Sequence, residues 1–184
     1  KRQNILMGVL NLTPDSFSDG GKFNSFNKAR KRIKNMINTG ADIIDIGGES
    51  TRPGSKIISQ KNELQRVKKV IKEFKKKYTK TLLSIDTRKS MVMKFSMKHN
   101  VDIINDVSCF QFDAKSFDTV KNKNLWKIIH HMQGTPQTMQ INPRYNNALL
   151  DVYDFFEREI EKFKNLKYGK KTILDPGIGF GKNK

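Results

Sequence analysis

Cysteine, acidic residues and long apolar runs are all scarce in this sequence of 184 residues, and each shortage excludes a class of protein. The single cysteine, Cys109, rules out an internal disulfide framework and fits a reducing compartment, so we expect a cytoplasmic protein. No apolar run reaches the ~18 residues that a membrane span needs, and no secretory leader is recognisable at the start. No repeat or low-complexity linker divides residues 1–184, which are expected to form one domain.

Acidic residues number only 18 against 36 lysines and arginines, which gives a formal net charge of +18. Such an excess can indicate a nucleic-acid partner, or simply a lysine-rich solvated surface. The lysines occur on nearly every expected helix, and no basic stripe is interleaved with aromatic residues. We therefore predict no nucleic-acid binding, but a positive field that attracts anionic, phosphorylated substrates.

Six short apolar runs of strand length alternate along the chain with segments of helical period. This alternation predicts an α/β fold with a parallel sheet and right-handed crossovers. The strands are expected at residues 5–10, 42–46, 81–85, 101–104, 125–129 and 172–174. The helices are expected around residues 26–37, 64–74, 92–97, 113–122 and 149–163.

A polar segment follows each expected strand, with residues such as Asn11, Glu49, Asp86, Asn105 and Asp175. Six strands could form an open doubly wound sheet or part of an eight-stranded barrel. An open sheet concentrates its site at one crevice, whereas a barrel turns the carboxyl ends of all its strands toward one mouth. Polar segments after all six strands therefore favour a (β/α)8 TIM barrel, truncated after about six strands.

Asp86, Asn105 and Asp175 would offer two carboxylates and an amide to a ligand if the strands bring them together. That set suits a planar ligand edge with several N–H donors, such as a guanidine-like ring edge. The alternative is that one or more of them only caps the helix that follows. Asn11, Thr51 and Arg52 offer neutral donors and a guanidinium instead, which suit phosphate oxygens.

Two further motifs resemble a metal site and a phosphate-binding loop, but their spacing favours neither. His130 and His131 are adjacent on an expected strand, so their side chains point to opposite faces and do not readily share a metal ion. The segment 177–182 is glycine-rich but lacks the spacing and the hydroxyl residue of a phosphate-binding loop. It is more consistent with a barrel loop on which Phe180 covers a ligand.

Several stretches of the chain, in the right order, resemble the signature segments of the dihydropteroate synthase family. The first two are long and specific, and they favour the synthases over related pterin-binding methyltransferases. The matching segments are Asn-Leu-Thr-Pro-Asp-Ser-Phe-Ser-Asp-Gly-Gly at 11–21, Gly-Gly-Glu-Ser-Thr-Arg-Pro-Gly at 47–54, Ile-Asp-Thr at 85–87, Ile-Asn-Asp at 104–106, His-Met-Gln-Gly at 131–134 and Leu-Asp-Pro-Gly-Ile-Gly-Phe-Gly-Lys at 174–182.

The resemblance implies a folate-pathway transferase that joins 6-hydroxymethyl-7,8-dihydropterin diphosphate to 4-aminobenzoate and releases pyrophosphate with Mg²⁺. It implies catalytic roles for Asp86 and Asp175, a Mg²⁺ contact for Asn11, and a possible homodimer in the full-length enzyme. Met132 would pack beneath the pterin ring. By similarity, the substrate-binding residues are Asn11, Thr51, Arg52, Pro53, Asp86, Asn105, Met132, Asp175 and Phe180.

The sequence also departs from the family, whose members continue for two more strands. A lysine, a Ser-Arg-Lys-Ser segment, and an arginine and histidine that bind diphosphate are expected in that part and have no counterpart here. We therefore expect either a fragment of a full enzyme or a decayed gene product. The alternative functions are a non-catalytic pterin-binding or structural remnant and a basic nucleic-acid binder.

Overall fold

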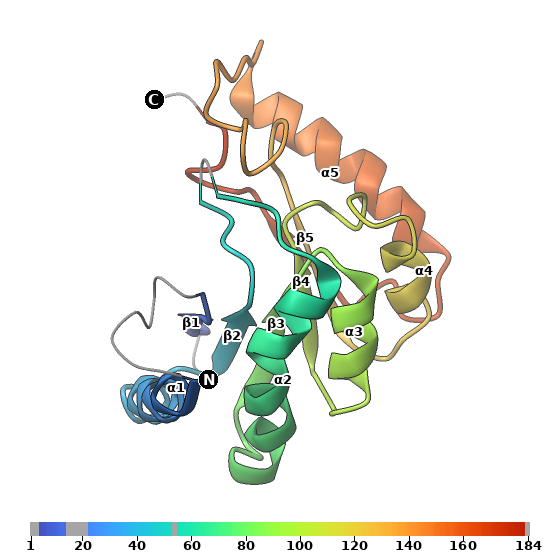
Figure 1. Cartoon of the computed structure of the whole chain (residues 1–184). Helices are drawn as coiled ribbons and strands as arrows, with labels where there is room; N and C mark the ends of the chain where they lie inside the picture. Colours follow the sequence, from blue (N-terminus) through green and yellow to red (C-terminus); the bar gives the residue numbers. More distant parts are fainter. Residues whose placement is uncertain (1–3, 14–21, 53–54, 183–184) are drawn as a thin grey trace.

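The computed structural model describes residues 4–13, 22–52 and 55–182, and within them helices and strands alternate throughout (Figure 1). The short helix α4 (Ser116–Val120) covers less than the segment 113–122 expected for it, because both oxygens of Asp113 accept hydrogen bonds from backbone N–H groups, those of Ser90 and Lys115. The elements are β1 (Met7–Asn11), α1 (Lys22–Asn38), β2 (Ile43–Gly47), α2 (Gln60–Lys77), β3 (Leu82–Asp86), α3 (Ser90–Met97), β4 (Ile103–Asp106), α4 (Ser116–Val120), β5 (Trp126–His130), α5 (Ala148–Lys164) and β6 (Thr172–Asp175).

The six strands form one parallel sheet in which the spatial order equals the chain order, from β1 to β6. A doubly wound sheet would reverse its strand order at a switch point, and this sheet does not. Because every right-handed crossover then places its helix on the same side, all helices cover one face and the sheet curls into a barrel wall. The expectation of an α/β fold built on barrel strands is confirmed.

The two faces of the sheet differ in what they contact. Residues such as Ile46, Ile85 and Ile104 point outward and form the main core with helix residues such as Ile71 and Phe74. The inner face carries a small cluster of Ile43, Ile103 and Ile128. Other inner positions lie open on the edge strands β1 and β6, where Val9 is 50% and Ile173 37% exposed. The inner face is therefore the more accessible one.

Each strand except β6 starts and ends one or two residues later than the apolar pattern indicates, and β6 ends one residue later. Asn11, Asp86, Asn105 and Asp175 are consequently members of the strands and not of the loops that follow them. The parallel ladder continues through these positions because main-chain pairing does not depend on whether the side chain is apolar. Strand membership fixes these side chains more firmly than a loop would.

The side-chain caps of α2 and α5 come from loop residues and not from the side chains at the strand ends. Ser59 accepts from the Asn62 N–H at the start of α2, and Asn147 accepts from two N–H groups at the start of α5. Asp113 accepts from Ser90, the first residue of α3. None of the described helices combines the length and the apolar composition that crossing a bilayer requires.

Candidate active site at the carboxyl end of the sheet

Asn11, Gly47, Asp86 and Asn105 form one row across four neighbouring strands, each paired in register with the next. Alternation along the strands places all four on the inner face. A Cβ at Gly47 would lie 3.0 Å from Asn11 Oδ1 and 3.4 Å from Asp86 Oδ2. Since Gly47 has no side chain, these two oxygens face a common space at the mouth of the barrel.

Asp45 lies one layer below this row, on the inner face of β2, and sequence reasoning missed it. It is 3% exposed, and its Oδ2 accepts from Asn105 Nδ2 at 3.2 Å. Asp45 Oδ1 and Asn105 Oδ1 are buried and have no hydrogen-bond partner among the described residues. The signal was an aspartate inside an apolar run, two residues before Gly47 and therefore on the same face.

Burial and like charge dominate the electrostatics of this cluster. Burial raises the pKa of Asp45. Burial also raises the pKa of Asp86 well above its usual value, and repulsion from Asp45 adds to the shift. A cluster of buried oxygens that lack donors is suited to a ligand that supplies several N–H groups.

Asp175 and His130 form the opposite wall of the mouth, as a register pair on β6 and β5. His130 Nε2 lies 3.9 Å from Asp175 Oδ2, and the imidazole meets the Phe180 ring edge-on with 4.5 Å between centroids. His130 is 4% exposed, and its Nδ1 has no hydrogen-bond partner within the described parts of the chain. Burial lowers the pKa of His130, which favours the neutral imidazole.

His131 points away from His130, as alternation along the strand predicts. Its Nδ1 lies 2.8 Å from Lys182 Nζ, and its ring packs edge-on against Phe155 of α5. Burial, with Lys182 nearby, lowers the pKa of His131 to about 4. The two histidines therefore have different surroundings, and His131 helps to hold the loop after β6.

Thr51 and Arg52 lie in the β2–α2 loop, which covers residues 48–59 between those two elements. Thr51 is partly buried and Arg52 is exposed. The Arg52 N–H donates to Ser50 Oγ at 3.3 Å, and its carbonyl accepts from the Ser55 N–H at 3.1 Å. Pro53, expected to share this site, lies outside the described residues.

The comparisons with known proteins agree with this geometry. Residues 7–184 match the family described as pterin binding enzyme. The chain belongs to this pterin-binding enzyme family. Dihydropteroate synthase from Escherichia coli (strain K12) is 42% identical over 179 residues, covering 97% of this chain and 63% of the relative. A folate synthesis bifunctional protein from Arabidopsis thaliana is 41% identical, covering 98% of this chain and 38% of the relative.

Solved structures give the same result for the fold. The dihydropteroate synthase of Yersinia pestis, in complex with a sulfonamide drug, has a TM-score of 0.88 and 39% identity over 97% of this chain and 65% of that one. The Burkholderia cenocepacia synthase, complexed with 7,8-dihydropteroate, has a TM-score of 0.82 and 35% identity over 98% and 61%. The chain thus forms six consecutive barrel strands and spans less than two thirds of the length of these relatives.

Met132 follows the end of β5 and, with His130 and Arg88, lines a cavity of about 200 Å³ between the β4 and β5 loops. The family resemblance points to Met132 as the residue beneath the pterin, and that role stays a prediction. On the strand itself, the inner position next to Asp175 belongs to His130. Sequence reasoning considered His130 only as a metal ligand and so missed it as a wall of the site.

The side-chain oxygens at the mouth are of the kind that a divalent cation such as Mg²⁺ takes as ligands. Within residues 4–13, 22–52 and 55–182, no three His, Cys, Asp or Glu side chains form a metal-binding group. Mg²⁺ commonly keeps several waters and takes few protein ligands when it accompanies phosphates. Asn11 Oδ1, which faces the open space above Gly47, is a suitable single contact for such an ion.

Proposed function

We propose that this protein is a dihydropteroate synthase of folate biosynthesis. It would condense 6-hydroxymethyl-7,8-dihydropterin diphosphate with 4-aminobenzoate to give 7,8-dihydropteroate and pyrophosphate. Family membership and relatives that carry this name support the proposal. Because the chain spans less than two thirds of those relatives, the proposal concerns the protein at its full natural length.

The observation that carries the proposal is the cluster of donor-free oxygens on the inner face. Asp45 Oδ1 and Asn105 Oδ1 lack partners among the described residues, and Asp86 lies beside Asn105 in the row. A pterin ring presents a guanidine-like edge with several N–H donors, which such acceptors can bind together. Binding would also stabilise carboxylates that burial otherwise disfavours.

In this proposal the residues act mainly by orienting the substrate and stabilising charge. Asp86, Asn105 and Asp175 would hold the pterin with its methylene carbon toward the mouth, and loss of diphosphate would leave positive charge near the carboxylate of Asp86. The weakly basic amine of 4-aminobenzoate would then attack that carbon. Mg²⁺, when bound near Asn11, would neutralise charge on the leaving diphosphate.

The second substrate would bind above the pterin, between two loops. We assign Thr51, Arg52 and Pro53 of the β2–α2 loop to one side of the aminobenzoate site and Phe180 of the loop after β6 to the other. Phe180 lies edge-on against His130, which supports this assignment. Residues 1–184 would be one barrel domain, incomplete at the carboxyl end. We further propose a cytoplasmic location, a homodimer at full length and no nucleic-acid partner.

The test is a steady-state assay of the full-length protein with the pterin diphosphate, 4-aminobenzoate and Mg²⁺. We expect one pyrophosphate for each 7,8-dihydropteroate formed, measured by chromatography and a coupled phosphate assay. Asp86→Ala should form little of either product while the protein remains folded. Pterin binding without any product in the full-length protein would instead support a non-catalytic remnant.

A further inference from the structure

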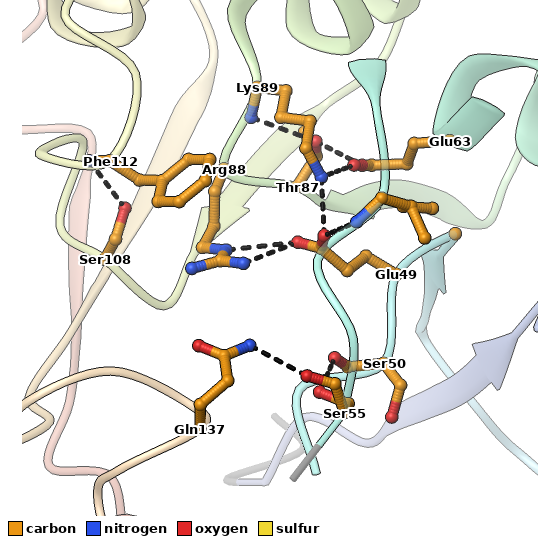
Figure 2. A network of polar contacts seen from close by, with 12 residues as sticks. Glu49, Ser50, Ser55, Glu63, Thr87, Arg88, Lys89, Ser108, Phe112 and Gln137 are labelled. Atoms are coloured by element: carbon orange, nitrogen blue, oxygen red, sulfur yellow. Dashed lines mark hydrogen bonds and ion pairs between the residues drawn. The ribbon is translucent and has the colours of Figure 1, made fainter. Parts of the chain in front are cut away.

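A buried network of charged side chains joins the β2–α2 loop to the segment that follows β3 (Figure 2). Glu49, Glu63, Arg88 and Lys89 form it, and none of them is more than 6% exposed. Two carboxylates face two cations, so the network is formally neutral. Arg88 and Lys89, the two cations nearest to Asp86 in sequence, are thus both paired with carboxylates inside the protein.

Glu49 is the residue that makes most of the contacts in this network. Its Oε2 accepts from Arg88 Nη2 at 2.8 Å and from Arg88 Nε at 3.2 Å, and its Oε1 pairs with Lys89 Nζ at 2.7 Å. Burial alone would raise the pKa of Glu49, but hydrogen bonds from Lys89, the Ile58 N–H and Arg88 outweigh it and lower the pKa. Glu49 is therefore ionised at neutral pH.

The same carboxylate connects the two ends of the β2–α2 loop. Glu49 Oε1 also accepts from the Ile58 N–H at 3.0 Å, nine residues further along the chain. Inside the loop, Ser55 Oγ donates to the Ser50 carbonyl at 2.6 Å, and Gln137 Nε2 donates to the Ser55 carbonyl at 3.1 Å (Figure 2). Thr51 and Arg52 thus lie on a segment whose ends depend on Glu49.

We propose that Glu49 is a positioning residue, which sets the place of Thr51 and Arg52 relative to Asp86 by binding both loop ends to Arg88 and Lys89. Arg88 and Lys89 follow Asp86 directly after Thr87, so one short segment carries both the pterin carboxylate and the partners of the loop. The identification of 4-aminobenzoate as the affected ligand rests on the proposed function, whereas the structural role of Glu49 rests on its contacts. Binding of 4-aminobenzoate should therefore depend on Glu49 more than binding of the pterin does.

Two variants of the full-length protein separate this role from general stability. Glu49→Gln keeps the shape of the side chain but removes the charge that holds it between Arg88 and Lys89. Glu63→Gln is the matched control, because the Glu63 carboxylate pairs with Lys89 and Thr87. Both variants replace a carboxyl group of the same buried network by an amide, and both should lower the melting temperature. Glu49→Gln combined with Arg88→Met restores the charge balance if the single variant does not fold.

The first readout is kinetic. Glu49→Gln should raise the KM for 4-aminobenzoate by about tenfold or more, since small misplacements of binding groups are costly. The dissociation constant of Glu49→Gln for the pterin diphosphate should change by less than about threefold. In Glu63→Gln, the KM for 4-aminobenzoate and the dissociation constant for the pterin diphosphate should both change by less than about threefold. Equal effects of the two variants on 4-aminobenzoate would overturn the proposal, since they would show a merely structural network.

The second readout does not depend on the reaction. Hydrogen–deuterium exchange of the ligand-free protein should become faster at the amides of Ser55 and Ile58 in Glu49→Gln, and change little there in Glu63→Gln. Unchanged exchange at both amides in Glu49→Gln would contradict the role of Glu49. If the wild-type protein formed no dihydropteroate, the proposed function would fail, while the exchange result would still decide the role of Glu49.

Discussion

Replacing Asp45 by Asn should stabilise the ligand-free protein and weaken its binding of the pterin. Asp45 is 3% exposed, accepts one hydrogen bond from Asn105 and has an unpartnered Oδ1 among the described residues. Burial raises its pKa, and its charge raises the pKa of Asp86 in turn. The variant keeps the shape of the side chain and removes the charge. A buried charged side chain that destabilises the ligand-free protein is expected in a binding site, where the ligand supplies the missing hydrogen-bond partners.

The size of both effects follows from the contacts. A buried polar group without its partner costs about 1–3 kcal/mol and a charged group costs more, so replacing the carboxylate by a neutral amide should stabilise the fold by about 1–2 kcal/mol. In a protein of this size that corresponds to a rise in melting temperature of roughly 2–8 °C. Loss of a charge-assisted hydrogen bond to the pterin should cost about 1.5–3 kcal/mol, or roughly 10- to 100-fold in affinity.

The stability of the wild-type protein and that of the variant should depend on pH differently. Since its folded-state pKa is raised, Asp45 binds its proton more tightly in the folded protein than in the unfolded chain. The wild-type free energy of unfolding therefore falls as pH rises from the ordinary carboxyl value of 3.8 through the raised value. The Asp45→Asn protein has no carboxyl group at this position, so its free energy of unfolding does not fall in this way. Its advantage in melting temperature should be largest at neutral pH and should shrink as the pH is lowered.

The assays are thermal unfolding from pH 5 to 8 and calorimetric titration with the pterin diphosphate. Asp102→Asn is the matched control at the opposite end of the sheet, where Asp102 pairs with Lys75 at 2.5 Å and accepts from the Leu83 N–H at 2.7 Å. It should lower the melting temperature and leave pterin affinity within about twofold. An Asp45→Asn protein that melts lower than wild type and binds the pterin equally well would refute the reasoning.

The remaining predictions concern the catalytic residues, pH, the metal and the sheet edges. Asp86→Ala or Asp175→Ala should raise the activation barrier by more than about 2 kcal/mol, which lowers kcat/KM in the product assay, whereas Lys34→Ala on an exposed helix face should change it little. Near-wild-type rates in either aspartate variant would argue against a catalytic role for that aspartate. Pterin affinity measured by titration should fall as the pH drops below the raised pKa of Asp86, because the protonated carboxyl accepts fewer N–H donors; a flat profile would contradict an ionised Asp86 in the complex. Chelation with EDTA should stop turnover and MgCl₂ should restore it, with Asn11→Ala needing more Mg²⁺; full activity in EDTA would exclude the metal role. Residues 1–184 expressed alone should form oligomers on size-exclusion chromatography, because β1 and β6 are edge strands with an exposed inner face, and joining them to the C-terminal third of a relative should reduce this; a stable monomer would show that the edges are protected.

Sequence periodicity predicted the six strands and the helices between them, because alternation of apolar runs and helical faces is a local property. It placed strand ends too early, at the last apolar residue, whereas Asp86 and Asn105 continue the ladder. The candidate residues Asn11, Asp86 and Asn105 were predicted, and their arrangement in one row required the strand register. Their chemical roles stay predictions.

Two parts of the site were missed in the sequence, because their positions depend on contacts between distant segments. Asp45 is a single polar residue inside an apolar run, and only the register of the strands shows that it lies beneath Asn105 and near Asp86. Glu49 and Arg88 are 39 residues apart, and nothing local indicates that they form a buried pair. Both depend on contacts between strands and loops that are far apart in the sequence. Composition and residue spacing do not reveal such contacts.

The most direct test of the account is an experimental structure of the full-length protein with 7,8-dihydropteroate bound. We expect the pterin edge within hydrogen-bond distance of Asp86, Asn105 and Asp175 on the inner face, with the aminobenzoate portion toward Thr51 and Arg52. A ligand bound elsewhere, such as in the lysine-lined cavity between α3 and α4, would contradict the assignment of the site.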